Sequence, residues 1–294
     1  MRPPREKRWV VREGDGTRVG EIVKKAGDDP QAAIAEGRVF VGKKRVASAS
    51  APVKVGDEVR IGAPGAAARR GRVLFERDGI VACVKEAGIP TVPDHAGSVH
   101  SLVAQVAAEI GRSADELVVT SRLDREVSGV VLFAVTPEAE ARLREARARG
   151  AYHRRYVAIA ATGGREVAPD PWDAPVADKP SRTLWSPVAF AGDFALLAVS
   201  PITGRTHQIR VHASRAGLPL LGDADYGGPS RVTLESGRVV TLSRIALHAA
   251  RVSAAGLTAS APIPTELGRV WTELGGRPEA WDIAVSCELE PSPK

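Results

Sequence analysis

The sequence is poor in cysteine, with only Cys83 and Cys287 among its 294 residues. The two are far apart and match no zinc-binding or redox spacing, which excludes a disulfide framework and a cysteine-based metal centre. We therefore expect both side chains to be reduced thiols in a cytoplasmic protein.

Long apolar runs and aromatic side chains are also scarce. No run approaches the roughly 20 apolar residues that a membrane span needs, and no apolar stretch of the signal-peptide kind follows the basic segment 1–8. We expect no membrane partner. Aromatic residues make up 4% of the chain, so the core must consist mainly of aliphatic side chains. Glycine-rich phosphate loops of the GxGxxG and GxxxxGK[ST] types are absent, as is any internal repeat.

Net charge is unevenly distributed along the chain, with little of it outside the N-terminal part. Residues 1–62 contain 14 Lys and Arg against 9 Asp and Glu, a net charge of +5, whereas the whole chain carries +6. A basic unit attached to a nearly neutral body indicates an anionic partner, most often a nucleic acid. The alternative at this point is charge that serves solubility alone.

The pattern of elements predicts two units of unequal size. Residues 14–62 are typical of a small α+β module, and residues 63–71, rich in Ala, Gly and Arg, are typical of a linker. In the larger unit, 72–294, strands and helices mix without regular βαβ alternation. The predicted fold class is therefore α+β, with a largely antiparallel sheet flanked by helices. Helices are expected there at 101–110 and 137–149, and strands at 73–75, 80–84, 130–134, 156–160, 187–190, 194–199, 239–242, 246–252 and 257–259.

One carboxylate lies between two arginines in the run 121–129, which reads SRLDREVSG. The flanking guanidinium groups favour the ionised form of Asp124, and an ionised carboxylate can act as a nucleophile or a base. Strand-like segments precede and follow the run, so Asp124 is expected in a connection at a sheet edge, where catalytic groups often lie. The alternative is a surface ion pair with Arg122 or Arg125.

A second segment, 202–212 (ITGRTHQIRVH), gathers arginines and histidines around a predicted helix start. Thr206 is expected to cap a helix that begins near His207, and His207 and Arg210 would then share one helix face. Arg205 would lie beside exposed amide groups, an arrangement suited to phosphate. The alternative is a structural helix with a solvated basic face.

One tyrosine and three histidines are further candidates for a functional role. Tyr156 lies in a predicted strand, where a tyrosine is usually part of the core, but an aromatic ring between arginines can also stack on a nucleobase. The histidines at 207, 212 and 248 lack zinc spacing and cysteine partners, so no metal site is predicted.

With these motifs the chain resembles the RluA-type family of RNA pseudouridine synthases. The family signature H-R-L-D-x-x-T-S-G corresponds to 121–129, and the block G-R-T-H-Q-I-R-V-H corresponds to 204–212. A following G-x-P-(I/L)-x-G-D-x-x-Y-G corresponds to 217–227, and an L-H-A element to 247–249. The resemblance spans roughly 72–265.

The chain departs from the family pattern at three places. Ser121 stands where the family has His, Val127 stands where it has Thr, and 85–88 read KEAG in place of KPAG. The N-terminal unit is similar to an S4 RNA-binding module at 37–41 and 55–59, but it lacks the Ser-Arg helix element usual in S4.

The resemblance implies an isomerase that converts specific uridines in RNA to pseudouridine without cofactor or metal. It implies that Asp124 is the essential carboxylate and that Arg210 is its ion-pair partner. Tyr156 is expected to stack on the target base and to assist proton transfer at C5. The candidates for substrate binding are Arg122, Arg205 and His207.

The implied partner is RNA, with large-subunit ribosomal RNA first and transfer RNA second, and the chain is expected to be a monomer. A catalytically inactive RNA-binding or ribosome-assembly protein of the same fold is an alternative, motivated by the departures at Ser121 and Val127. A general hydrolase that uses Asp124 is another, although no second carboxylate or oxyanion-hole motif is evident.

Overall fold

The computed structural model describes residues 7–35, 38–42, 44–46, 48–62, 72–93 and 101–289. The predicted linker 63–71 lies outside the described residues. By its internal contacts the chain divides into two compact units, 1–73 with 89–119, and 74–88 with 120–294. The segment 89–119 thus groups with the first unit, and the predicted boundaries at 14–62 and 72–294 stay a prediction.

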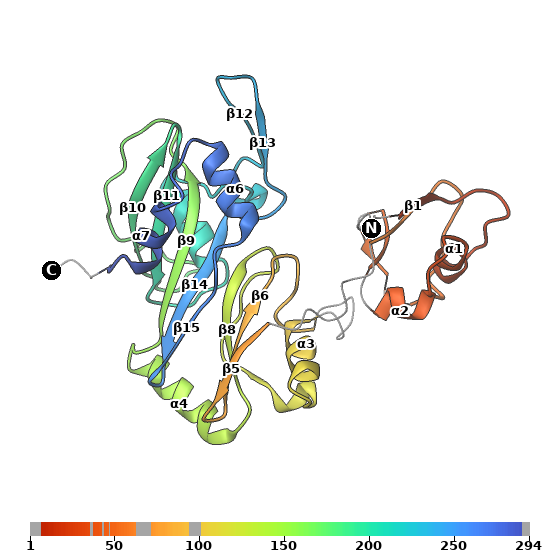
Figure 1. Ribbon diagram of the computed structural model, residues 1–294, viewed down its shortest axis with the longest axis horizontal. Helices are drawn as coiled ribbons and strands as arrows, with labels where there is room; N and C mark the ends of the chain where they lie inside the picture. Colours follow the sequence, from red (N-terminus) through yellow and green to blue (C-terminus); the bar gives the residue numbers. More distant parts are fainter. Residues whose placement is uncertain are drawn as a thin grey trace. The chain divides into compact units, whose positions relative to one another are not determined.

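Within the first unit, the described residues of 7–62 form a four-stranded antiparallel sheet in the order β1-β4-β2-β3. The same residues form two short helices, α1 and α2 (Figure 1). Strand alternation turns Val39, Val59 and Ile61 toward a small core that also holds Ile22 and Val23 of the first helix. This sheet begins ahead of residue 14, because β1 pairs with β4. The elements are β1 (Lys7–Val10), α1 (Val19–Lys25), α2 (Pro30–Ala35), β2 (Val39–Val41), β3 (Lys44–Arg45) and β4 (Glu58–Ile61).

The segment 89–119 of the first unit carries α3 (Leu102–Glu109), the 3-10 turn η1 (Ala114–Glu116) and the two-residue strand β7 (Val118–Val119). The hydroxyl of Ser101 accepts a hydrogen bond from the Ala104 amide at 3.3 Å and caps α3. The helix predicted at 101–110 is therefore confirmed.

The second unit is built on one large sheet in the order β10-β11-β9-β14-β8-β6-β5, with β15 paired to β14. β8 and β14 run parallel, whereas β10 with β11, β11 with β9, β9 with β14, β14 with β15 and β6 with β8 run antiparallel. The predicted α+β class with a largely antiparallel sheet is confirmed. The strands are β5 (Val73–Arg77), β6 (Ile80–Lys85), β8 (Ser128–Ala134), β9 (His153–Ala161), β10 (Thr183–Ala191), β11 (Phe194–Pro201), β14 (Leu247–Ala254) and β15 (Leu257–Ser260), with a separate hairpin of β12 (Arg231–Thr233) and β13 (Val239–Thr241).

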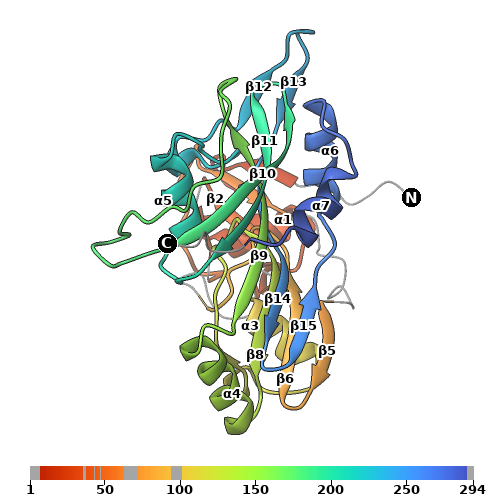
Figure 2. The same ribbon diagram turned by 90° about the vertical axis from the view of Figure 1, so that its left-hand side faces the viewer.

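Helices cover both faces of this sheet. α6 (Thr265–Glu273) and α7 (Ala280–Ser286) lie on one face, and α5 (Gln208–Arg215) lies on the other (Figure 2). α4 (Pro137–Ala148) confirms the helix predicted at 137–149, with proline in its first turn. Its cap is Thr136, whose hydroxyl accepts a hydrogen bond from the Ala139 amide. No helix among the described residues is long and apolar enough to cross a bilayer.

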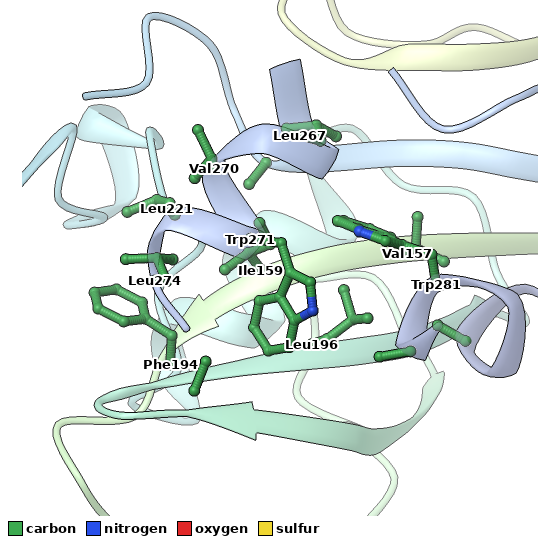
Figure 3. Packing of buried hydrophobic residues seen from close by; sticks show 14 of the residues in the cluster. Val157, Ile159, Phe194, Leu196, Leu221, Leu267, Val270, Trp271, Leu274 and Trp281 are labelled. Atoms are coloured by element: carbon green, nitrogen blue, oxygen red, sulfur yellow. The ribbon is translucent and has the colours of Figure 1, made fainter. Parts of the chain in front are cut away.

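Two tryptophans form the centre of the core beneath α6 and α7. The rings of Trp271 and Trp281 meet edge to face with centroids 6.4 Å apart, over Val157, Ile159 and Leu196 of the sheet (Figure 3). These two helices were not predicted from the sequence. The signal for α6 was present, because its buried positions 267, 270, 271 and 274 recur at helical spacing.

Candidate active site

Asp124 lies in the loop 120–127 that precedes β8, with 28% of its side chain exposed. The Val127 amide donates to the Asp124 carbonyl at 3.1 Å and closes a turn. The carbonyl of Arg125 accepts two further hydrogen bonds, from the Gly88 amide at 2.8 Å and from Lys85 Nζ at 2.9 Å. The backbone around Asp124 is thus held from the segment at the end of β6.

Strand register brings Tyr156 close to this loop. Gly129, Ala249 and Tyr156 lie opposite one another across β8, β14 and β9. A side chain at position 129 would collide with the backbone of Ala249, and Gly129 has φ +129°, so glycine is required there. Tyr156 is buried, and burial raises the pKa of its phenol, with the nearby Asp124 acting in the same direction.

The start of α5 differs from the prediction. The helix begins at Gln208, and the residue before it, His207, has φ +55°, a left-handed conformation that is uncommon for a residue with a side chain. Thr206 does not cap the helix: it is exposed, and its hydroxyl forms no cap hydrogen bond. The Gln208 side chain instead holds the loop before the helix, since its Oε1 accepts from the Arg205 amide at 3.0 Å and from the Thr203 hydroxyl at 2.7 Å.

His207 and Arg210 nevertheless both face Asp124. His207 Nε2 lies 3.8 Å and Arg210 Nη1 lies 3.4 Å from the same carboxylate oxygen, Oδ2. His207 Nδ1 is 3.0 Å from the Tyr226 hydroxyl, and the two rings meet edge to face. An imidazole held between a carboxylate and a phenol is a suitable group for moving a proton.

Arg210 is buried and has more partners than the predicted one. Its Nε and Nη2 bind both carboxylate oxygens of Asp223 at 2.8 and 2.7 Å, and Nη2 also lies 2.9 Å from Asp225. Burial alone would lower the pKa of the guanidinium, but the hydrogen bonds with Asp223 and Asp225 and the charge of Asp124 outweigh that effect and raise it. Arg210 is therefore a permanent cation shared among three carboxylates.

Two residues of the second motif hold α5 in place. Gln208 Nε2 donates to the Thr183 hydroxyl at 2.9 Å, and His212 Nδ1 lies 2.9 Å from that same oxygen. His212 Nε2 lies 2.7 Å from the Ala174 carbonyl, and burial lowers the pKa of this imidazole. No role was predicted for Gln208, because nothing in the sequence distinguishes a buried polar side chain in the first turn of a basic helix from an exposed one.

The other predicted substrate-binding residues lie at the surface. Arg122 is exposed and forms no hydrogen bond or ion pair with any described residue. Arg205 is also exposed, but its guanidinium donates weakly to the Pro180 carbonyl at 3.3 and 3.4 Å. The Arg205 amide itself is paired with the Gln208 side chain.

The departures from the family signature have partners away from Asp124. The Ser121 hydroxyl lies 3.0 Å from the Tyr152 hydroxyl, and the Val127 side chain is buried among apolar atoms. Neither exchange leaves an unpaired polar group beside the carboxylate.

A buried polar cluster beneath the loop was missed by sequence reasoning. Arg244 Nη2 donates to the Ser128 hydroxyl at 2.8 Å, and that hydroxyl lies 2.7 Å from His248 Nδ1. Burial, reinforced by the charge of Arg244, lowers the pKa of His248 to about 4 and that of Lys85 to about 7. Within the described residues, no group of His, Cys, Asp and Glu is arranged to hold a metal ion.

This arrangement supplies a partly exposed carboxylate beside a fixed guanidinium, an imidazole and a buried phenol. The family model described as RNA pseudouridylate synthase matches residues 79–215, which include Asp124, Tyr156 and Arg210. An RNA pseudouridine synthase of Zymomonas mobilis, itself uncharacterised, is 32% identical over 69% of this chain and 97% of its own length. The chain belongs to the RluA-type family of RNA pseudouridine synthases.

Other members of the family are similar to a comparable degree. The ribosomal large subunit pseudouridine synthase D of Xanthomonas campestris is 32% identical over 69% of each chain. The dual-specificity RNA pseudouridine synthase RluA of Salmonella typhi is 30% identical over 60% of this chain and 83% of its own. Membership makes this protein an RNA-directed isomerase of the pseudouridine synthase type.

The solved structure of human RNA pseudouridylate synthase domain containing 4 has the same fold. It superposes with a TM-score of 0.54 at 19% identity and covers 71% of this chain and 94% of that one. The S4-like assignment of the N-terminal unit lies outside the matched residues 79–215 and stays a prediction.

Proposed function

We propose that this pseudouridine synthase acts on specific uridines of large-subunit ribosomal RNA and that Asp124 is its essential carboxylate. The observation that carries the proposal is the position of Asp124. It is partly exposed, lies 3.4 Å from Arg210, and projects from a loop whose backbone is fixed by Lys85 and Gly88. A reacting carboxylate needs this combination of access and fixed orientation.

The other side chains have complementary roles in this proposal. Arg210 orients Asp124 through their 3.4 Å contact, and Tyr156 stacks on the target base and assists removal of the C5 proton. The target uridine must leave its base stack to reach Asp124, which costs about 2–4 kcal/mol of unstacking free energy. The exposed side chains of Arg122 and Arg205 contact the flanking nucleotides, and no step requires a cofactor or metal.

The N-terminal unit supplies non-specific affinity for RNA in this proposal. Its basic charge supports this role, and so does the Arg60 guanidinium, which lies 5.5 Å over the Phe40 ring on the sheet. Arginine and an aromatic ring together can bind phosphate and stack on bases. Binding through this unit would weaken steeply as salt rises.

Pseudouridine mapping of total RNA tests the proposal. The RNA comes from cells with the gene intact, with the gene deleted, or with Asp124→Asn in its place. We expect one or a few ribosomal sites to disappear in both altered strains. Loss of a pseudouridine in transfer RNA instead would identify transfer RNA as the substrate. A pseudouridine that persists in the Asp124→Asn strain but is lost on deletion would show that Asp124 is not the essential carboxylate.

The catalytically inactive alternative makes a different prediction for the same experiment. If the protein only binds RNA, neither altered strain loses a site. The contacts of Ser121 and Val127 away from the carboxylate favour an active enzyme, because the two exchanges that motivated the alternative leave the surroundings of Asp124 intact.

A further inference from the structure

The loop that carries Asp124 is held on both sides of the carboxylate. After Asp124, the Arg125 carbonyl accepts a hydrogen bond from Lys85 Nζ at 2.9 Å. Before Asp124, the hydroxyl of the half-buried Ser121 lies 3.0 Å from the hydroxyl of Tyr152. The contact of these two hydroxyl groups, the Ser121–Tyr152 pair, therefore joins the first half of the loop to the segment that leads into β9.

Tyr152 presents its hydroxyl from a fixed position. The side chain is buried and packs in a core cluster with apolar residues of α4 and β8. Two guanidinium groups lie against its ring, Arg147 with Cζ 4.7 Å and Arg154 with Cζ 6.0 Å from the ring centroid. Cations placed over an aromatic ring are attracted to it and oppose its rotation away from them. A loop bound to this hydroxyl is thus bound to the core.

Arg154 extends the contact to the second motif. Its Nη2 donates to the Pro201 carbonyl at 3.2 Å and to the Thr203 carbonyl at 2.9 Å, in the loop that leads to α5. The charge of Arg154 also acts on the phenol of Tyr156 and opposes the rise in its pKa that burial causes. Tyr152 therefore contacts the loop of the first motif directly and the loop of the second motif through Arg154.

We propose that Ser121 and Tyr152 are positioning residues, whose hydroxyl pair fixes the half of the loop ahead of Asp124 and so orients the reacting carboxylate. Serine ends at its γ oxygen, so its partner must have a long side chain, and the anchored Tyr152 supplies one. The exchange of histidine for serine at position 121 is then a different way of holding the loop. The inference rests on the proposed role of Asp124.

Other contacts hold the same half of the loop and limit the size of the effect. The Thr120 hydroxyl donates to the Leu132 carbonyl of β8 at 3.1 Å, and Leu123 is buried. Loss of the Ser121–Tyr152 pair should therefore loosen the carboxylate without unfolding the loop.

Ser121→Ala and Tyr152→Phe test the proposal, because each removes one oxygen atom of the pair and keeps the packing. Each should lower kcat about fivefold at an unchanged apparent KM for RNA, the loss expected from one hydrogen bond that orients the carboxylate. Both variants delete the same hydrogen bond, so the double variant should lose no more than either single one. Ser121→Thr retains the hydroxyl and should keep the kcat of the wild type. Turnover is measured as release of tritium from uridine C5 in RNA isolated from cells lacking the gene.

Ser253→Ala is the matched control. Ser253 forms a hydroxyl pair of the same kind with Thr258 at 2.9 Å, where β14 pairs with β15, and its loss should leave kcat unchanged. A wild-type kcat in folded Ser121→Ala and Tyr152→Phe overturns the proposal, even if urea unfolding shows lower stability. Losses that add in the double variant overturn it as well. If Tyr152→Phe does not fold, the kcat of Ser121→Ala decides alone.

Asp124→Asn in the same assay separates a failure of this proposal from a failure of the proposed function. Its control is Asp78→Asn, since Asp78 is exposed in the β5–β6 turn with φ +51°, which asparagine tolerates. Turnover by Asp124→Asn at the wild-type rate refutes the proposed function. Wild-type kcat in the two hydroxyl variants beside an inactive Asp124→Asn refutes only the role of the Ser121–Tyr152 pair.

Discussion

Two clusters with buried cations flank the loop that carries Asp124, and they hold these cations by different means. The carboxylate-bound cluster consists of Arg210, Asp223 and Asp225. The carbonyl-bound cluster consists of Lys85, Arg244, Ser128 and His248. In the first, carboxylates surround the cation and raise its pKa. In the second, the cations donate to carbonyls and a hydroxyl, and burial lowers their pKa values.

The difference separates two tasks. The carboxylate-bound cluster keeps its charge at every physiological pH and points it toward Asp124. The carbonyl-bound cluster fixes backbone, because Lys85 binds the Arg125 carbonyl and Arg244 binds the Leu247 carbonyl. The clusters should therefore respond differently when a cation is removed and when the pH is changed.

The largest expected effect is on stability. Arg210→Met leaves the buried Asp223 without its cation, which should lower the free energy of unfolding by about 3–5 kcal/mol. Arg244→Met leaves carbonyls and the Ser128 hydroxyl without a donor, at about 1–3 kcal/mol. Urea unfolding of the two matched variants measures the difference. Equal losses, or a larger loss for Arg244→Met, would contradict the contrast between the clusters.

The next effect concerns alkaline pH. The folded pKa of Lys85 is about 7, below its ordinary 10.5, so between these values the unfolded chain binds a proton that the folded chain lacks. The free energy of unfolding should therefore rise with pH in this window, by up to about 1.4 kcal/mol per unit. Lys85→Met should lose this rise, whereas Lys179→Met, at an exposed turn, should keep it. The same dependence of unfolding free energy on pH in the wild type and both variants would show that Lys85 is not the group responsible.

A smaller effect is expected in acid. The folded pKa of His248 is about 4, below the ordinary 6.5, so the unfolded chain binds the extra proton between these values. Stability should fall as pH drops from 6.5 toward 4. His248→Gln should flatten this part of the curve while leaving the alkaline rise of Lys85 intact. Thermal unfolding of the wild type and His248→Gln at closely spaced pH values measures this difference. If the variant loses stability between pH 6.5 and 4 as steeply as the wild type, His248 is not the group that titrates.

The smallest expected effect is that of removing the Tyr226 hydroxyl while its ring is kept. Tyr226→Phe keeps the ring against Arg210 and removes the hydrogen bond to His207 Nδ1. We expect a loss of stability of about 1 kcal/mol and a few-fold loss of kcat, roughly 3-fold, from a less firmly oriented imidazole. Denaturant unfolding and steady-state rates measure both. A loss of stability as large as that of Arg210→Met would show that the hydroxyl, and not the charge pairing, holds this cluster.

Much of the architecture could be predicted from local sequence patterns. The strands β5 and β6 were predicted from the turn residues between them, and α3 and α4 from the helical periodicity of their apolar residues. The approach of Arg210 to Asp124 followed from the family resemblance, and the geometry agrees with it.

What could not be predicted depends on partners far away in the chain. The pairing of Arg210 with Asp223 requires the turn at 220–228 to fold back on α5, and the contact of Arg244 with Ser128 joins residues 116 apart. Thr206 was misjudged as a cap because the backbone turns at His207, with φ +55°, which places Thr206 one residue before the N-cap. Polar residues in such roles have no periodicity that distinguishes them from exposed ones.

The central claim is that Asp124 performs the chemistry, and label release from RNA tests it most directly. Formation of pseudouridine replaces the C5 hydrogen of uridine, so RNA tritiated at that carbon and isolated from cells lacking the gene loses label on turnover. We predict release by the wild type and by Asp78→Asn, and none by Asp124→Asn at unchanged affinity for RNA. Release by Asp124→Asn at the wild-type rate would contradict the account.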